Sequence, residues 1–141
     1  MGILRAICTT GLTIVVAFGM SCSLRKDKVI GESAVARFHS QFNAEQYHEI
    51  YGHTDDGFRK TTSEQQMNEY LKAVNRKLGE VKDAKQVGWH VNATTAGTQV
   101  FLVYKTTFAE GDAREEFVFV VNGNDSRLFR YNIQSPILIT K

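Results

Sequence analysis

The chain has 141 residues, of which 43% are hydrophobic and 23% charged, with one Pro and two Cys. This composition fits one globular domain and excludes the disordered, collagen-like and disulfide-framework classes. Seventeen basic and 15 acidic side chains leave a formal net charge of +2. That balance is too even for a protein that binds by neutralising many phosphates, so nucleic acid is excluded as a partner.

Residues 1–21 have the layout of a secretory signal peptide. A start that carries Arg5 precedes an uncharged stretch built around the apolar run 12–18, and small residues follow. Polar residues dilute this stretch, whereas a membrane-spanning helix needs about 20 predominantly apolar residues. One alternative stays open. The cations at positions 25, 26 and 28 outnumber Arg5, and the more positive flank of a membrane helix stays in the cytoplasm. An uncleaved helix would therefore keep the globular part cytoplasmic.

A cysteine stands just after the apolar run, with Ser21 directly before Cys22. This pattern resembles the lipobox of bacterial lipoproteins, with Gly19 where that family usually has Leu. The resemblance implies cleavage before Cys22, lipid attachment to its sulfur and an exported protein anchored in the bacterial cell envelope, facing the periplasm or the cell exterior. Several acyl chains on one residue would hold it stably at a membrane. The alternative is the ordinary signal peptidase, for which Ala17 and Gly19 offer suitable small residues.

The residues after the signal are expected to form a tether and then two helices. Segment 22–31 is polar and basic without a core-forming pattern, so we expect a short tether. From Glu32 the apolar spacing becomes helical, with Ser33 as a cap and an end near Asn43. A second short helical turn spans 47–51. The apolar residues of these two helices are Val35, Phe38 and Phe42, then Tyr47, Ile50 and Tyr51.

The next segment combines a predicted loop with the most clearly marked helix of the chain. Residues 53–62 are polar and contain Gly57, which predicts a surface loop. Thr62 or Ser63 then supplies a cap, and Gly79 stands where a helix commonly ends. The apolar stripe of this helix consists of Met67, Tyr70, Leu71, Val74 and Leu78.

After Gly79 the apolar spacing changes to two, which predicts strands. Short turns separate four such segments, so we expect an antiparallel meander. Helices first and sheet second give an α+β domain over 32–141, with the helices packed on one face of a curved four-stranded sheet. The predicted strands are 86–94, 99–108, 115–121 and 128–133.

The two central strands are apolar on both faces. Phe101 and Val103 alternate with inward residues in the second strand, and Val118 and Val120 do so in the third. The helices can cover one face only, because each is about 10 Å wide. We therefore expect either a tightly curled sheet or a homodimer or protein partner docked on the outer face.

This order of elements resembles the nuclear-transport-factor-like or cystatin-like roll of small exported bacterial proteins. The resemblance spans 32–136 and rests on the bent helical pair, the loop with Phe58, the following helix and a meander that contains Trp89 and Tyr104. It implies a curved sheet wrapped around helices, a conical pocket open at one end and frequent dimerisation. The fold hosts isomerases, dehydratases and binding modules alike, so function stays open.

Three histidines and two aspartates form the one cluster suited to acid/base chemistry. His48, His53 and Asp55 are the candidates for a small isomerase-like or dehydratase-like enzyme, with His39 and Asp56 nearby in sequence. Turn formation explains a polar run before Gly57 equally well. A paired-His helix motif and a Cys cluster are both missing, so we expect no metal and no cofactor.

Aromatic residues could line a pocket or fill the core. The pocket candidates are Tyr47, Tyr51, Trp89 and Tyr104, since such side chains combine apolar walls with polar tips. Glu115 and Glu116 stand opposite Lys105, and we expect a solvated strand end there, with a cross-strand charge pair as the alternative. The favoured interpretation is an envelope-anchored binding or interaction module, with the small enzyme as the alternative.

Overall fold

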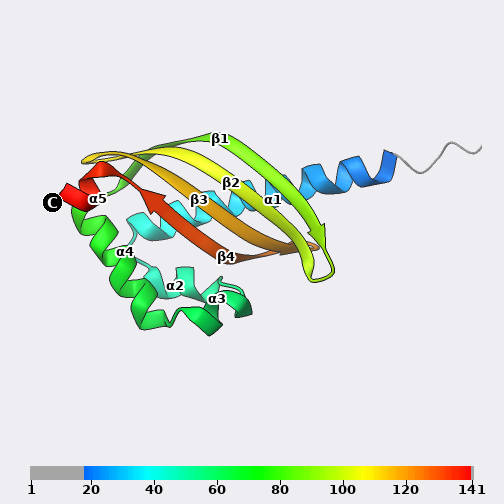
Figure 1. Ribbon diagram of the computed structural model, residues 1–141, viewed down its shortest axis with the longest axis horizontal. Coiled ribbons are helices and arrows are strands. Elements are labelled where there is room, and N and C mark those ends of the chain that lie inside the picture. The colour runs from blue at the N-terminus through cyan, green and yellow to red at the C-terminus, as the bar shows by residue number, and fades with distance from the viewer. Residues whose placement is uncertain (1–17, 141) are drawn as a thin grey trace, which may run out of the picture.

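The structure is a computed structural model that describes residues 18–140. Most of the predicted signal peptide lies outside these residues. The described chain contains five helices and four strands, in the order α1 (Phe18–Asn43), α2 (Tyr47–Gly52), α3 (Asp56–Thr61), α4 (Glu64–Leu78), β1 (Val81–Thr94), β2 (Gly97–Phe108), β3 (Gly111–Asn122), β4 (Asp125–Gln134) and α5 (Pro136–Thr140). Figure 1 shows this arrangement, with α1 running behind the sheet and with α2 and α3 below it.

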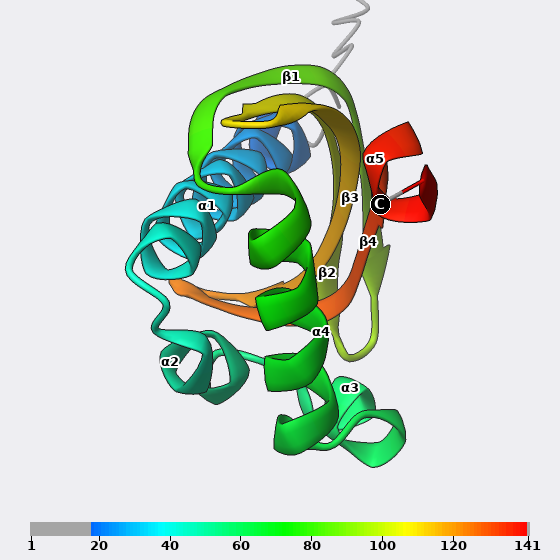
Figure 2. The same ribbon diagram turned by 90° about the vertical axis from the view of Figure 1, so that its left-hand side faces the viewer.

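The four strands form one antiparallel sheet in sequence order, which confirms the predicted meander and the α+β class. The sheet curls around α1, while α4 lies in front of it (Figure 2). β1 begins at Val81 rather than near the predicted Gln86. The missed residues lack an apolar alternation, but they pair with the end of β2 across a register shift.

Helix α1 is much longer than predicted, and the expected tether at 22–31 was wrong. It runs unbroken for 26 residues to Asn43. Once a helix has nucleated, each added residue gains a hydrogen bond, and an ion pair between Lys28 and Glu32 supports the early turns. Asp27 and Gly31 are buried, so this segment belongs to the domain. No helix within 18–140 has the length and apolar content to cross a membrane.

Helix α1 crosses the concave face of the sheet at very short range. A Cβ atom on Gly31 would lie 2.9 Å from Val100 Cγ1 and 3.2 Å from a Leu102 methyl carbon, so only Gly fits there without a shift. Further along, Phe38 packs edge to face on Phe117 with ring centroids 5.2 Å apart. Phe42, Leu71, Leu78 and Leu102 complete the centre of the core.

The predicted loop 53–62 contains helix α3, which the sequence pattern missed. The Asp55 side chain caps this short helix by accepting a hydrogen bond from the Gly57 backbone N–H at 2.7 Å. Thr54 forms an isolated parallel bridge with Leu128 of β4. In this segment, a polar residue that suggested a loop is instead the N-cap of a short helix. By contrast, the predicted helix at 63–78 is confirmed, with a capping box between Ser63 and Gln66.

The outer face of the sheet is less open than its sequence suggested. Within the single chain, Val118 is only 2% exposed and Val120 only 9% exposed. Their neighbours in register include the long side chains of Arg127 and Arg130 on β4. Phe101 and Val103 remain half-buried. Much of the area assigned to a partner is therefore already covered, and the expectation of a partner on this face stays a prediction.

Substitution of Gly31 by Leu should destabilise the protein. Leu is a far better helix former than Gly, so any loss must come from the close approach to Val100 and Leu102. We expect the free energy of unfolding to fall by about 1–3 kcal/mol, the usual cost of overpacking. Urea unfolding measures it. The control is Ala36→Leu on the exposed face of α1, and an equal effect of both variants would contradict the close approach.

Candidate functional site

The interior of the roll is packed with side chains where a conical pocket was expected. Between α1, α2 and the sheet, the hollow that Ala34, Phe38 and Ile50 help to line holds about 10 Å³, room for one water molecule at most. Of the pocket candidates, Tyr47 and Tyr104 are both buried in the core. The long helix α1 occupies the space that a ligand would need.

The three candidate catalytic residues do not converge. His48 is exposed, and its Nδ1 lies 2.6 Å from Glu64 Oε1, a hydrogen bond that raises the pKa of His48. His53 Nδ1 lies 2.8 Å from the backbone oxygen of Glu49, one turn earlier. Asp55 is the cap of α3. Each side chain therefore serves a separate local contact. Within 18–140, no three His, Cys, Asp or Glu residues are grouped to hold a metal ion.

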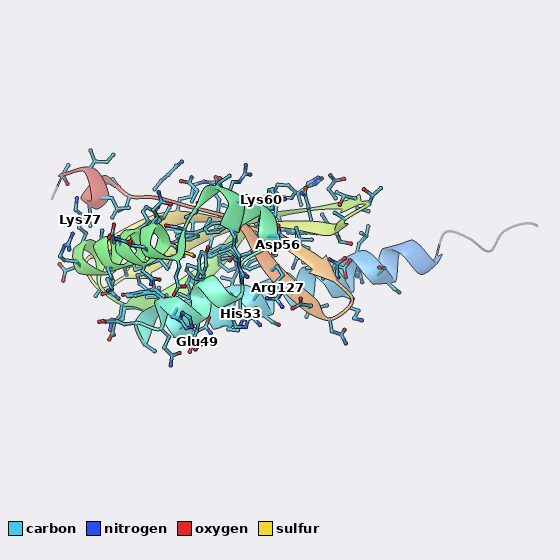
Figure 3. The ribbon with its side chains drawn as sticks, turned by 90° about the horizontal axis from the view of Figure 1, so that it is seen from below. Glu49, His53, Asp56, Lys60, Lys77 and Arg127 are labelled. Carbon is cyan, nitrogen blue, oxygen red and sulfur yellow. The ribbon has the colours of Figure 1, made fainter. Side chains whose placement is uncertain are left out.

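Two arginines close the end of α2 near these residues. Arg59 Nη2 donates to the carbonyl oxygen of Gly52 at 2.9 Å, and Arg127 Nη1 donates to the same oxygen at 3.1 Å. They satisfy carbonyl groups that a helix end leaves without partners. A polar hollow of about 310 Å³ lies beside them. Figure 3 shows His53, Asp56 and Arg127 on this face of the molecule.

The unexpected polar centre of the structure is Glu115 on β3. Its Oε2 accepts hydrogen bonds from His39 Nε2 at 2.7 Å and from Thr106 Oγ1 at 2.5 Å. Its Oε1 accepts a hydrogen bond from the Tyr131 hydroxyl at 2.7 Å. An ionised carboxylate only accepts, so all three partners donate. Glu115 is 1% exposed, and the prediction of a solvated strand end was wrong.

Aromatic rings pack around this network. Phe117 packs 5.7 Å from the His39 ring and 5.0 Å from the Tyr131 ring, measured between centroids. Burial raises the pKa of Tyr131 well above its usual value, and the Glu115 charge and hydrogen bond add to the shift. A low dielectric strengthens satisfied polar contacts. The arrangement ties α1, β2 and β4 to β3, which is a structural role.

A signal for this network exists in the sequence. Glu115 shares strand parity with Phe117 and Phe119, so alternation alone places it on the inward face. His39 follows Phe38 directly, at the border of the apolar stripe of its helix. His39 stands 76 residues from Glu115 in the sequence, and Thr106 stands 9 residues from it. Sequence spacing therefore gave no means of pairing them.

The larger hollows lie at the end of the sheet beside α5. One of about 420 Å³ is lined from all four strands, and an adjoining one of about 590 Å³ lies against α5. They share Arg114, Gln134 and Pro136, so we treat them as one groove, the α5 groove. Its apolar lining includes Val87, Tyr104, Ala113, Ile133, Leu138 and Ile139. Such a hollow is the usual form of a binding site.

The remaining candidates lie at the surface. Cys22 is a free, exposed thiol near the start of α1. Trp89 is 56% exposed, and the Lys28 ammonium lies 5.3 Å from the centroid of its ring. Tyr51 is half-buried, and its hydroxyl donates to the backbone oxygen of Thr62 at 3.2 Å. Only Tyr104 among the four aromatic candidates lines the α5 groove.

Removal of the Glu115 carboxylate should cost far more than removal of its neighbour. Glu115→Ala leaves the buried donors of His39 and Thr106 and the half-buried Tyr131 hydroxyl unpaired, so we expect the free energy of unfolding to fall by about 3–5 kcal/mol. The control Glu116→Ala removes a surface pair with Arg114 and should change stability by about 0.5 kcal/mol or less. Chemical denaturation compares the two. Similar losses would show that the buried network contributes little.

The buried tyrosines should make the protein less stable in alkali. Burial raises the pKa of Tyr104 to about 12 and also raises the pKa of Tyr131 well above its usual value. Since the folded state then keeps protons that the unfolded chain has released, the free energy of unfolding falls as pH rises above about 10. Below that pH both states keep these protons, so the two tyrosines do not make the free energy of unfolding depend on pH. Urea midpoints from about pH 9 to about pH 11 measure the trend, and Tyr131→Phe should flatten it. A constant midpoint would contradict this assignment.

Comparison with known proteins identifies the family. A family model described as "Protein of unknown function (DUF4019)" matches residues 33–131. The match begins within α1 and continues into β4, and it includes His39, Thr106, Glu115 and Tyr131. No curated protein matches the sequence. Because the family model covers well over half of the chain, the protein belongs to the DUF4019 family.

Proposed function

We propose that this protein is exported, anchored by lipid on Cys22 in the bacterial cell envelope, and acts there as a binding module. The observation that carries the proposal is the continuity of α1. The helix joins the lipobox-like segment to the core, and the Cys22 thiol is exposed in its early turns. An anchor at this point would hold the domain through a rigid helix instead of a flexible linker.

The two ends of the molecule support different roles. The first turns of α1 project beyond the sheet at one end, and α5 lies at the other (Figure 1). From Cys22 to Asn43 the helix rises by about 30 Å. A lipid on Cys22 would therefore place the α5 groove on the side of the domain that faces away from the membrane. There the groove would be open to other molecules of the envelope.

The chemistry of the α5 groove favours a partner with apolar side chains. Its charged residues already have partners, since Lys105 pairs with Asp112 and Arg114 pairs with Glu116. The groove therefore offers apolar area beside balanced charge, which suits a protein segment better than a highly charged ligand. The enzymatic alternative has less support, because His48, His53 and Asp55 each have a separate structural contact.

Substitution of Cys22 by Ala tests the anchor. Without the sulfur there is no acceptor for diacylglycerol, so the variant should lose the acyl mass and either remain unprocessed or leave the membrane. Intact mass of the membrane-extracted protein and cell fractionation measure this. The matched control is Cys8→Ala, within the predicted signal peptide, which should yield the same mature mass as the parent chain. Unchanged mass and membrane retention of the Cys22 variant would contradict the anchor.

A photo-crosslinking amino acid at Gln134 tests the binding role. Gln134 lines the α5 groove and is exposed, so a bound partner would lie within reach of the probe. We expect a discrete crosslinked product in intact cells. The control position is Lys72, exposed on α4 outside the groove residues, where the product should be missing. Products from both positions, or from neither, would contradict a specific role for the groove.

A further inference from the structure

The most exposed apolar side chains gather near the start of α1 and on the neighbouring strand. Val29 is 58% and Trp89 is 56% exposed. Among the described residues only Ile139, on α5, is a more exposed large apolar side chain. α1 contacts β1 directly, and Lys28 bridges from the helix to the Trp89 ring. Together these side chains form one surface, which we call the α1–β1 edge.

Helical spacing brings the anchor residue onto the same side of α1. Cys22, Arg25, Lys26 and Val29 stand at positions i, i+3, i+4 and i+7, and all four are exposed. This stripe faces away from the sheet. Lys28 lies on its flank and leads to Trp89. A molecule that touches the stripe can therefore reach the whole α1–β1 edge.

The charge of this surface is positive. In the described part of the chain, neither Arg25 nor Lys26 forms an ion pair, whereas Lys28 is paired with Glu32. The nearby Asp27 is buried, so its side chain faces away from the stripe. Arg25 and Lys26 lie about 4.5–6 Å along the helix from Cys22, within one Debye length of about 8 Å.

We propose that the α1–β1 edge is a membrane-contact surface that holds the domain against an anionic phospholipid bilayer. The proposal rests on the lipid anchor proposed above, because an acyl group on Cys22 would bring the stripe to the level of the headgroups. Two free cations attract anionic lipid, and Trp is the side chain that favours the boundary between water and hydrocarbon. Val29 supplies apolar contact beside Trp89.

A bilayer fits this surface better than a second copy of the chain. A protein interface places apolar and aromatic groups at its centre and depletes Lys there. Here, cations lie between the exposed apolar side chains and the anchor residue. The surface is also small and lies close to a lipid attachment point, a combination typical of anchors that combine an acyl group with basic residues.

The protein carries its own reporter, because Trp89 is its single Trp. Membrane-extracted protein is reconstituted in vesicles of phosphatidylcholine, or of equal parts phosphatidylcholine and phosphatidylglycerol, with brominated acyl chains in both. We expect strong quenching of Trp89 emission in the anionic vesicles and weak quenching in the neutral ones. Raised salt should reduce the quenching, because it screens the attraction.

Paired substitutions test the role of charge. Arg25→Gln combined with Lys26→Gln should lower the ratio of docked to undocked domains roughly 25-fold, about fivefold for each charge removed. The matched control combines Lys72→Gln with Arg76→Gln on the exposed face of α4 and should change nothing. All four positions are exposed, so both variants should fold.

Three results would overturn the proposal. The first is no quenching, and the second is equal quenching in both vesicles that the Arg25 and Lys26 substitutions leave unchanged. The third is a change in Trp89 emission that follows protein density at constant lipid, which would assign the surface to a second copy. Intact mass separates the two proposals. Acylated protein with unquenched Trp89 overturns the contact surface alone, whereas protein without acyl mass on Cys22 overturns the anchor and the contact surface with it.

Discussion

The packing of α1 against the concave face of the sheet is the constraint on which the rest of the structure depends. Gly31 allows the helix to approach β2 closely, and Phe38 enters between the aromatic rings of the sheet. Both contacts set the position of the helix along and around its own axis. Because the helix takes up the centre of the roll, the interior is a core and not a ligand cavity. A binding role, as proposed above, would then fall to the outside of the domain.

The buried Glu115 network gives this packing its specificity. Apolar contacts alone tolerate small slides of a helix, but three hydrogen bonds to one carboxylate do not. Burial of a charge is costly, and the cost is offset only when every partner is present. The network therefore favours one arrangement of α1, β2, β3 and β4. A helix fixed in this way could hold the domain in one orientation if its first turn were attached to a membrane.

This rigidity links the two proposals for function. If Cys22 is the attachment point, the orientation of the domain follows from the direction of α1, because no flexible segment lies between them. The α1–β1 edge would then meet the lipid headgroups while the α5 groove faces outward. The molecule would act as an oriented platform. The difference between its two ends comes from where charge and apolar area lie on the surface. Such a role needs no catalytic group.

Local patterns in the sequence were sufficient for much of the fold. The capping box at Ser63 and the stripe that follows it defined α4, and the alternation after Gly79 defined four strands in a meander. These patterns are reliable because caps and periodicity act between near neighbours. The same reasoning was wrong for 22–31 and 53–62, where polar composition was taken as a sign of irregular structure. Polar residues also form exposed helix faces and caps.

The sequence by itself determined the α+β class, the order of the elements and the lipobox-like pattern at Cys22. Only the tertiary structure decided that Glu115 is buried, that the interior is full and that Trp89 lies beside the start of α1. The physical reason is that burial depends on what packs opposite a side chain. For Glu115 the partners come from three different elements. For Trp89 the neighbour is helix α1, and the composition of residues 22–31 did not reveal that the helix extends that far. Such pairings arise from the folded arrangement and leave no fixed spacing in the chain.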